Sequence, residues 1–150
     1  MLLADEPFLQ LHVELDEILH LGETPYGDRR VIHIAGGRFE GRVAGRIIPG
    51  GADWQIVRND GVADVQARYT LETEAGERVL VRSEGLRHGP AEVIAALGRG
   101  EPVDPVRYYF RTVIRFETSA PALAWMNRIL SVARGAREPR AVRLDVFEVL

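Results

Sequence analysis

Residues 36 to 54 read GGRFEGRVAGRIIPGGADW, which places short strand-like fragments between glycines and ends on the pair Asp53-Trp54. Glycine inside a strand pattern marks a bulge, a tight bend or the close approach of another backbone or a ligand. This block therefore predicts strand fragments interrupted at one or more of these features. It carries more information about architecture than about chemistry.

Before and after this block in the sequence, apolar and polar residues alternate with a period of two, as expected of strands with one buried face. The clearest apolar sets are Leu9, Leu11, Val13 and Leu15; Val65, Ala67, Tyr69 and Leu71; and Val142, Leu144 and Val146. Residues 74 to 77 lie between two such segments, where a hairpin loop is expected. The chain is therefore predicted to consist mainly of antiparallel strands.

Two segments favour helices. A short one opens at Pro90 and closes near Gly98, and a longer α-helix is predicted from about Pro121 to Ala133, with Ser119 as a capping residue. About eight to ten strands with one or two helices favour a mainly β, single-domain antiparallel β-barrel over residues 1 to 150, since closure removes exposed sheet edges. A β-sandwich is the competing architecture.

Composition excludes several classes of chemistry. The chain has no cysteine and no lysine, because all 19 basic residues are arginine, so thiolate chemistry, Schiff bases and phosphate-loop lysines are excluded. The formal net charge of −3 gives no basic field for nucleic acid. The N-terminal residues are acidic where a signal peptide is expected to begin with cationic ones, and no apolar run is long enough for a membrane span. We expect a cytoplasmic protein with neither nucleic acid nor membrane as a partner.

Several motifs in fixed order resemble those of a known bacterial family. They are Gly36-Gly37, Gly41, Gly45, residues 49 to 54 (PGGADW), residues 64 to 71 (DVQARYTL), residues 108 to 111 (YYFR) and Trp125-Met126-Asn127. Together they resemble the DUF3237 family, also called UPF0311, over nearly the whole chain. The resemblance implies a single-domain antiparallel β-barrel that forms a homodimer. It implies no activity and no catalytic residues.

The best candidate site joins Asp53, Tyr109 and Arg111 as catalytic residues with Arg30, Trp54, Tyr69 and Trp125 as ligand-binding residues. Gly50-Gly51 can turn the chain so that Asp53 and Trp54 face a concave space. Burial would raise the pKa of the Asp53 carboxyl and suit it to act as a general base. The competing interpretation is that Asp53 caps a turn and that Trp54 belongs to the core or the barrel rim.

Residues 107 to 116 (RYYFRTVIRF) alternate between two faces. If Tyr109 and Arg111 point into the barrel, a phenol and a guanidinium can stabilise charge on a carboxylate or an enolate. The alternative is a ladder of arginines on the outside of the barrel, which is favoured for Arg107 and Arg115.

Metal and cofactor signals are weak. His12, Glu14 and Asp16 share a strand face and could join His33 or His88 around a metal ion, but alternating charged residues usually mark only the wet side of a strand. The glycines at 36, 37 and 41 precede a strand rather than a helix, so they do not form a dinucleotide-binding fingerprint. We therefore predict neither a metal nor a cofactor.

Two functions from different classes remain open. The first is a small-molecule-binding barrel that acts as a carrier or as a cofactor-independent isomerase, cyclase or lyase on a small organic carboxylate or carbonyl compound. The second is a structural or interaction protein, a homodimer whose barrel interior is solid core, with Trp54 and Trp125 in packing or in the interface.

Overall fold

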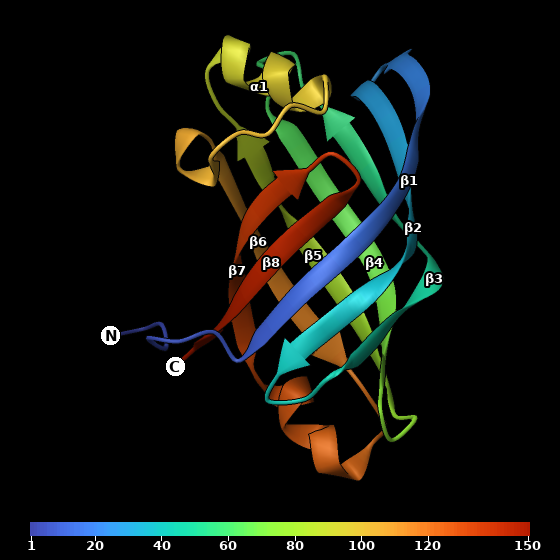
Figure 1. Cartoon of the computed structure of the whole chain (residues 1–150), viewed down its shortest axis with the longest axis vertical. Helices are drawn as coiled ribbons and strands as arrows, with labels where there is room; N and C mark the ends of the chain where they lie inside the picture. The colour runs from blue at the N-terminus through green and yellow to red at the C-terminus, as the bar shows by residue number, and fades with distance from the viewer.

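The computed structural model describes all residues from 1 to 150, and it forms a closed antiparallel β-barrel of eight strands (Figure 1). Each strand pairs with the next along the chain, and β1 pairs with β8 to close the ring. The strands are β1 (Leu9–Thr24), β2 (Gly27–Gly41), β3 (Gly45–Val57), β4 (Ala63–Thr73), β5 (Arg78–His88), β6 (Tyr109–Glu117), β7 (Leu130–Glu138) and β8 (Ala141–Val149). The predicted barrel is confirmed.

The predicted alternation places side chains inside and outside the barrel. In β4 and β6 every second residue is buried, which is the pattern of a pleated strand with one face toward the interior. The loop predicted at residues 74 to 77 connects β4 to β5, and Gly76 takes a positive φ of 83° there. Glycine adopts this left-handed conformation without the steric penalty of a side chain.

The glycines of residues 36 to 54 mark irregular pairing, as the sequence predicts. Between the pairs Ile48–Thr70 and Ala52–Arg68, β3 advances four residues while β4 advances two, so β3 carries two extra residues within residues 49 to 51. An even insertion keeps the side chains on their original faces. Asp53 therefore points to the interior and Trp54 to the exterior.

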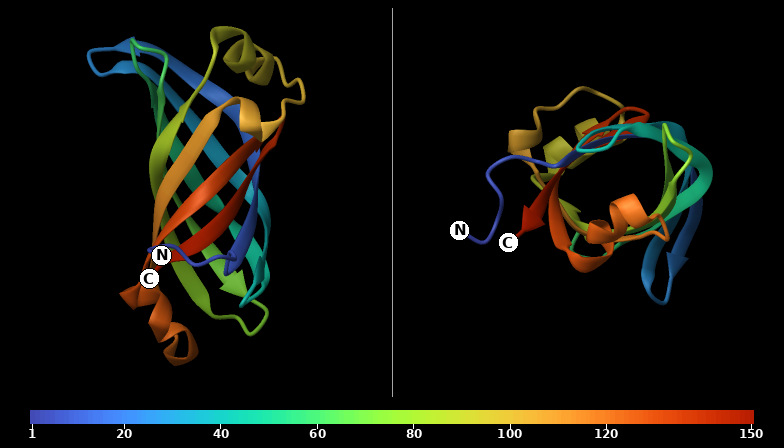
Figure 2. Two further views of the ribbon diagram at one scale, coloured as in Figure 1. Left: turned by 90° about the vertical axis from the view of Figure 1, so that its left-hand side faces the viewer. Right: turned by 90° about the horizontal axis from the view of Figure 1, so that it is seen from below.

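The two ends of the barrel are covered differently. The helix α1 (Ala91–Gly98), predicted from Pro90, lies at one end together with the short 3₁₀ helix η1 (Pro105–Arg107), as Figure 1 shows. A second 3₁₀ helix, η2 (Pro121–Arg128), lies at the other end, nearest the viewer in the right-hand view of Figure 2. No helix has the length and apolar character needed to cross a membrane.

The predicted α-helix from Pro121 to Ala133 is wrong in type and length. The 3₁₀ helix ends at Arg128, and β7 begins at Leu130. Ser131 and Ala133 are fully buried and face the barrel interior, while Arg134 is exposed. Residues 130 to 134 fit both a helical and an alternating pattern. The strand forms because β6 and β8 would otherwise each present an unpaired edge.

Inward-facing side chains fill one half of the barrel and leave a small cavity in the other half. The half nearest η2 is packed with large apolar residues, among them Leu9, Leu11, Leu71, Val79, Val81, Ile114, Met126 and Val146. The same strands continue toward α1 with smaller or polar inward residues, such as Ala67, Ser83 and Thr112. A cavity therefore forms in the half of the barrel nearest α1.

Candidate functional site

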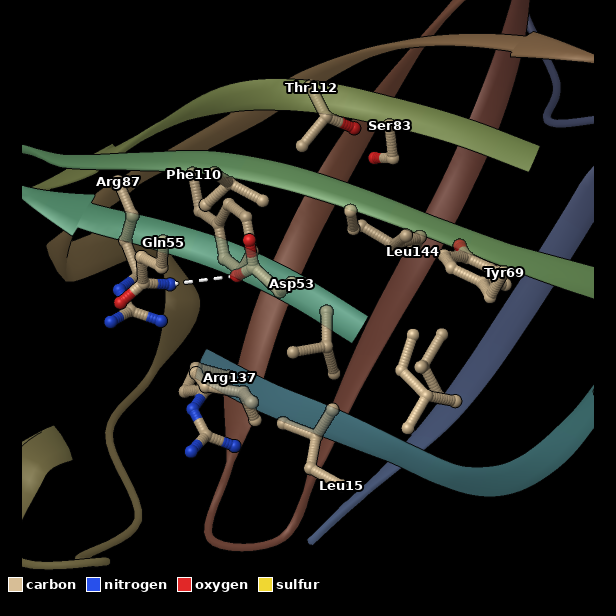
Figure 3. Close-up of a pocket in the computed structure, with 16 residues that line it drawn as sticks. Leu15, Asp53, Gln55, Tyr69, Ser83, Arg87, Phe110, Thr112, Arg137 and Leu144 are labelled. Carbon is tan, nitrogen blue, oxygen red and sulfur yellow. Dashed lines mark hydrogen bonds between the residues drawn. The ribbon is translucent and has the colours of Figure 1, made fainter. Parts of the chain in front are cut away.

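The cavity is lined by 16 residues drawn from all eight strands, and its volume is about 50 Å³ (Figure 3). It shares Ile32, Arg87 and Arg137 with a wider cleft of about 500 Å³ at the barrel mouth. The mouth cleft is also lined by Ile94 and Leu97 of α1. The three shared residues therefore stand where the mouth cleft meets the inner cavity.

Asp53 of β3 lies at this junction and is held by two hydrogen bonds. Its Oδ1 accepts from the backbone N–H of Gln66 at 2.9 Å, and its Oδ2 accepts from Nε2 of Gln55 at 2.9 Å. The side chain of Asp53 is buried, and burial raises the pKa of its carboxyl, although the two hydrogen bonds and the nearby Arg87 and Arg30 oppose that shift. Asp53 is thus a buried carboxyl with its orientation fixed.

Three arginines surround Asp53, and we call Arg30 of β2, Arg87 of β5 and Arg137 of β7 the arginine triad. Burial lowers the pKa of all three guanidinium groups, that of Arg87 to about 10. Repulsion from Arg137 and Arg30 also lowers the pKa of Arg87, while Asp53 opposes that shift. All three remain charged at neutral pH.

Two members of the triad are tied to the fold and one is not. Arg30 donates through Nη2 to Oε1 of Gln55, which itself holds Asp53. Arg137 donates through Nη1 to the carbonyl oxygens of Glu138 at 2.7 Å and Ala141 at 3.2 Å. Arg87 instead lies over the ring of Phe110, with 5.7 Å between its Cζ and the ring centroid. The Arg87 guanidinium makes no hydrogen bond within the protein, and Nε of Arg30 is buried without a partner, so both have donors left for a ligand.

The charges of this group do not balance. None of the seven ion pairs of the molecule includes a member of the triad. Three guanidinium groups therefore face one buried carboxyl, and a desolvated surplus of positive charge attracts an anion strongly because the surrounding dielectric is low. Forked guanidinium donors fit the two oxygens of a carboxylate.

Three of the residues predicted from sequence come together here. Asp53 and Tyr69 line the cavity, and Arg30 lines the mouth cleft and contacts Gln55. The hydroxyl of Tyr69 is buried without a hydrogen-bond partner. Asp53 does not cap a turn, which was the competing interpretation. It lies within β3, and its carboxyl accepts a hydrogen bond from the backbone of Gln66 on β4.

The other four predicted residues lie elsewhere. The expected inward orientation of Tyr109 and Arg111 is wrong, since both are exposed on the outer face of β6 while Phe110 and Thr112 point inward. Trp54 is 45% exposed on the outer face of β3. Trp125 of η2 packs edge-on against Phe8 at the opposite end of the barrel, with 5.6 Å between the ring centroids.

Three residues of this site were not predicted from the sequence, although the sequence contains a signal for each. They are Gln55, Arg87 and Arg137. Gln55 lies two residues after Asp53 and therefore shares its face. Arg87 and Arg137 continue two inward-facing series, Val81-Ser83-Gly85-Arg87 and Ser131-Ala133-Gly135-Arg137. A charged residue in the inward register of a barrel strand indicates a polar interior site.

The histidines and carboxylates considered for a metal ion do not converge. Glu14 and Asp16 are exposed on β1, and no group of three or more histidine, aspartate or glutamate side chains could hold a metal ion anywhere in the structure.

Comparison with known proteins places the chain in a family. A UPF0311 protein of Bradyrhizobium diazoefficiens is 43% identical over 136 residues, which span 91% of this chain and 90% of that protein. The crystal structure of a conserved protein of unknown function from Rhodopseudomonas palustris matches with a TM-score of 0.92 and 38% identity, covering 99% of this chain and 97% of that one.

A β-barrel-like protein from Acinetobacter baumannii matches with a TM-score of 0.83 and 41% identity, covering 95% of this chain and 93% of that one. The family model described as protein of unknown function DUF3237 matches residues 4–149. The resemblance noted in the sequence is therefore confirmed, and this chain belongs to the DUF3237 family.

Proposed function

We propose that the barrel binds a small organic anion, with the negatively charged oxygens at the arginine triad and a short apolar part in the inner cavity. The observation that carries this proposal is the surplus of positive charge at the junction, where three partly desolvated guanidinium groups face the buried carboxyl of Asp53, and only Arg30 has a second carboxylate nearby, that of Asp28. A carboxylate there would pair with Arg87 and relieve its repulsion with Arg30 and Arg137.

As a catalyst, the barrel would act as a cofactor-independent isomerase, cyclase or lyase, with Asp53 as the general base. A carboxylate with a raised pKa is a stronger base, and its two hydrogen bonds hold it in one orientation. Oxygen charge that develops as a proton leaves a carbon next to a carbonyl would be stabilised by Arg87 and Arg137. This assigns to the triad the role that the sequence suggested for Tyr109 and Arg111.

The binding test uses 4-methylpentanoate, a small carboxylate with an apolar tail, and measures its Kd by NMR titration. Arg87→Gln should weaken binding by at least about ten-fold, because it removes a charged hydrogen-bond donor. The matched control is Arg82→Gln, on the outer face of the same strand, which makes the same charge change far from the cavity. Equal affinity in the wild type and Arg87→Gln would contradict the proposal.

The catalytic part is tested with 4-oxopentanoate in D₂O. A base in the cavity should speed the exchange of protons next to the ketone for deuterium, which NMR detects directly. Asp53→Asn should abolish this acceleration while keeping the Kd of the probe within a few-fold. Exchange at the same rate in the variant would rule out Asp53 as the base.

A second candidate function, an interaction surface between two copies of the chain, rests on the outer face of the barrel. Trp54 and Leu80 are 45% and 41% exposed and line one shallow groove together with Ile48 and Pro49. Aromatic residues are enriched in protein interfaces. Sedimentation velocity should then find a dimer in the wild type and a monomer in Trp54→Gln. A wild-type monomer at all concentrations would argue against this function.

A further inference from the structure

Three hydroxyl-bearing side chains face the cavity away from the arginine triad. Tyr69 of β4, Ser83 of β5 and Thr112 of β6 line it, and each is at most 3% exposed to solvent. Figure 3 shows Tyr69 at the opposite side of the cavity from the Arg87 and Arg137 side chains. We call these three residues the hydroxyl floor. The cavity therefore has a cationic end and an uncharged polar end.

Two hydroxyls of the floor are buried without any hydrogen-bond partner in the protein, namely Tyr69 Oη and Thr112 Oγ1. Buried polar groups are nearly always paired, so each exception requires an explanation. Elsewhere this fold does pair its buried hydroxyls. Ser131 Oγ donates to the carbonyl oxygen of Ile114 at 2.7 Å, and the hydroxyl of Tyr108 accepts from the backbone N–H of Arg137 at 2.9 Å.

The Tyr69 hydroxyl is a donor that lacks an acceptor. Burial raises the pKa of this phenol far above its ordinary value, so it keeps its proton at every physiological pH. A phenol O–H next to an empty space accepts a guest that brings an oxygen acceptor, and it disfavours a purely apolar guest of the same shape. Thr112 can donate to the same guest or accept from it.

The spacing of the two ends limits the size of the guest. Asp53 pairs with Ala67 in the β3–β4 register, and the backbone of Tyr69 lies two residues farther along β4, which is about 7 Å of strand, comparable to a chain of four or five carbon atoms. A cavity of about 50 Å³ also admits only a short chain beyond the triad.

We infer that the ligand of this barrel is a short oxo-carboxylic acid, with its carboxylate at the arginine triad and its carbonyl oxygen at the hydroxyl floor. This inference rests on the proposed function and adds to it the second functional group of the ligand. Tyr69 Oη donates to the carbonyl oxygen, and Thr112 Oγ1 is a second unpaired hydroxyl in the lining of the same cavity.

The test compares two carboxylates of nearly equal size. In 4-oxopentanoate the fourth carbon bears a carbonyl oxygen, whereas in 4-methylpentanoate it bears a methyl group in the same place. NMR titration should give a Kd for the oxo acid that is about five- to ten-fold lower than for the methyl compound, as expected for one or two neutral hydrogen bonds. Tyr69→Phe and Thr112→Val, which keep the side-chain shape, should remove most of this preference.

The outcomes distinguish failure of this inference from failure of the proposed function. If both compounds bind with equal Kd and the two variants change nothing, the floor hydroxyls are satisfied by water and this inference is overturned, while anion binding stands. If neither compound binds, the proposed function fails as well, and with it this inference. Thr70→Val, at a half-buried neighbouring position whose side chain does not line the cavity, is the matched control and should keep the full preference.

Discussion

At the scale of single residues, the interior of this barrel keeps polar groups that cost stability. Asp53 is buried beside three arginines, and Tyr69 keeps an unpaired hydroxyl in the cavity wall. Desolvated charges and unpaired donors both lower the free energy of unfolding. Such costs are typical of binding sites, where the groups are arranged for a ligand rather than for the fold.

Asp53 should make stability depend on pH. Its folded pKa is raised by burial, so the folded protein holds this proton over a range in which the unfolded chain has lost it. The free energy of unfolding of the wild type should therefore fall relative to Asp53→Asn as the pH rises from about 4 through the raised pKa, by about 1.4 kcal/mol for each pH unit of that window. Urea denaturation at a series of pH values measures this. A difference that is constant with pH would show that the pKa is not raised.

The two buried tyrosines provide a matched pair of stability variants. Tyr108→Phe removes the oxygen that accepts from the Arg137 N–H and should lower the free energy of unfolding by about 1 kcal/mol. Tyr69→Phe removes a hydroxyl that has no partner and should leave stability unchanged or raise it. Chemical denaturation of both variants distinguishes the cases, and equal losses would mean that the Tyr69 hydroxyl is satisfied in the folded protein.

At the scale of elements, β7 is the strand that shapes the cavity wall. Phe110 of β6 lies against Gly135 of β7, where a Cβ atom would come within 2.7 Å of the ring. The missing side chain leaves Phe110 outside the space that a ligand would use. Glycine is needed at this inward-facing position because a larger residue would clash with a neighbouring side chain, not because the chain turns there.

Gly135→Ala should therefore push the Phe110 ring into the cavity. We expect a loss of about 1 to 3 kcal/mol in the free energy of unfolding from overpacking, and weaker binding of 4-oxopentanoate. Gly98→Ala is the control for stability alone, because Gly98 itself lines the mouth cleft. No atom lies within 4 Å of the position that a Cβ would occupy there, and alanine favours the end of α1. Thermal denaturation and NMR titration of both variants test this, and a Gly135→Ala protein with wild-type values would refute the packing argument.

At the scale of the whole molecule, closure of the sheet determines which parts open first. Every strand has two hydrogen-bonded neighbours, so no strand can detach without breaking two ladders. By contrast, α1 buries only Val93 and has no side-chain cap at its first turn. Local stability follows buried contacts and protected hydrogen bonds.

Hydrogen exchange should reflect this difference. Strand amides of β4 and β5 should exchange only through global unfolding, while those of α1 should exchange much faster through local opening. Addition of 4-oxopentanoate should slow exchange in α1 as well, because Ile94 and Leu97 line the mouth cleft through which the probe enters. Mass spectrometry of peptides from each region measures both effects. Protection of α1 equal to that of β4 would show that α1 is an integral part of the barrel's cooperative unit.

The amino-acid sequence by itself predicted most of the strands and favoured a barrel over a sandwich, because alternation and glycine placement are local properties of the chain. It also pointed to Asp53, since the flexible Gly50-Gly51 pair precedes it, and to Arg30 and Tyr69 as its candidate neighbours, without predicting which way their strand faces point. It misassigned residues 130 to 133 to a helix, because a helical and an alternating pattern coincide there and pairing with β6 and β8 selects the strand.

Only the tertiary structure decided which face of each strand points to the interior. It thereby decided which residues form the candidate site. Tyr109 and Arg111 share a face that local pattern cannot orient, and ring closure turned that face outward. Closure also brought Arg87 and Arg137 beside Asp53 from strands that are distant in the sequence. The arginine triad and the hydroxyl floor depend on the meeting of all these strands, so no single segment of the chain encodes them.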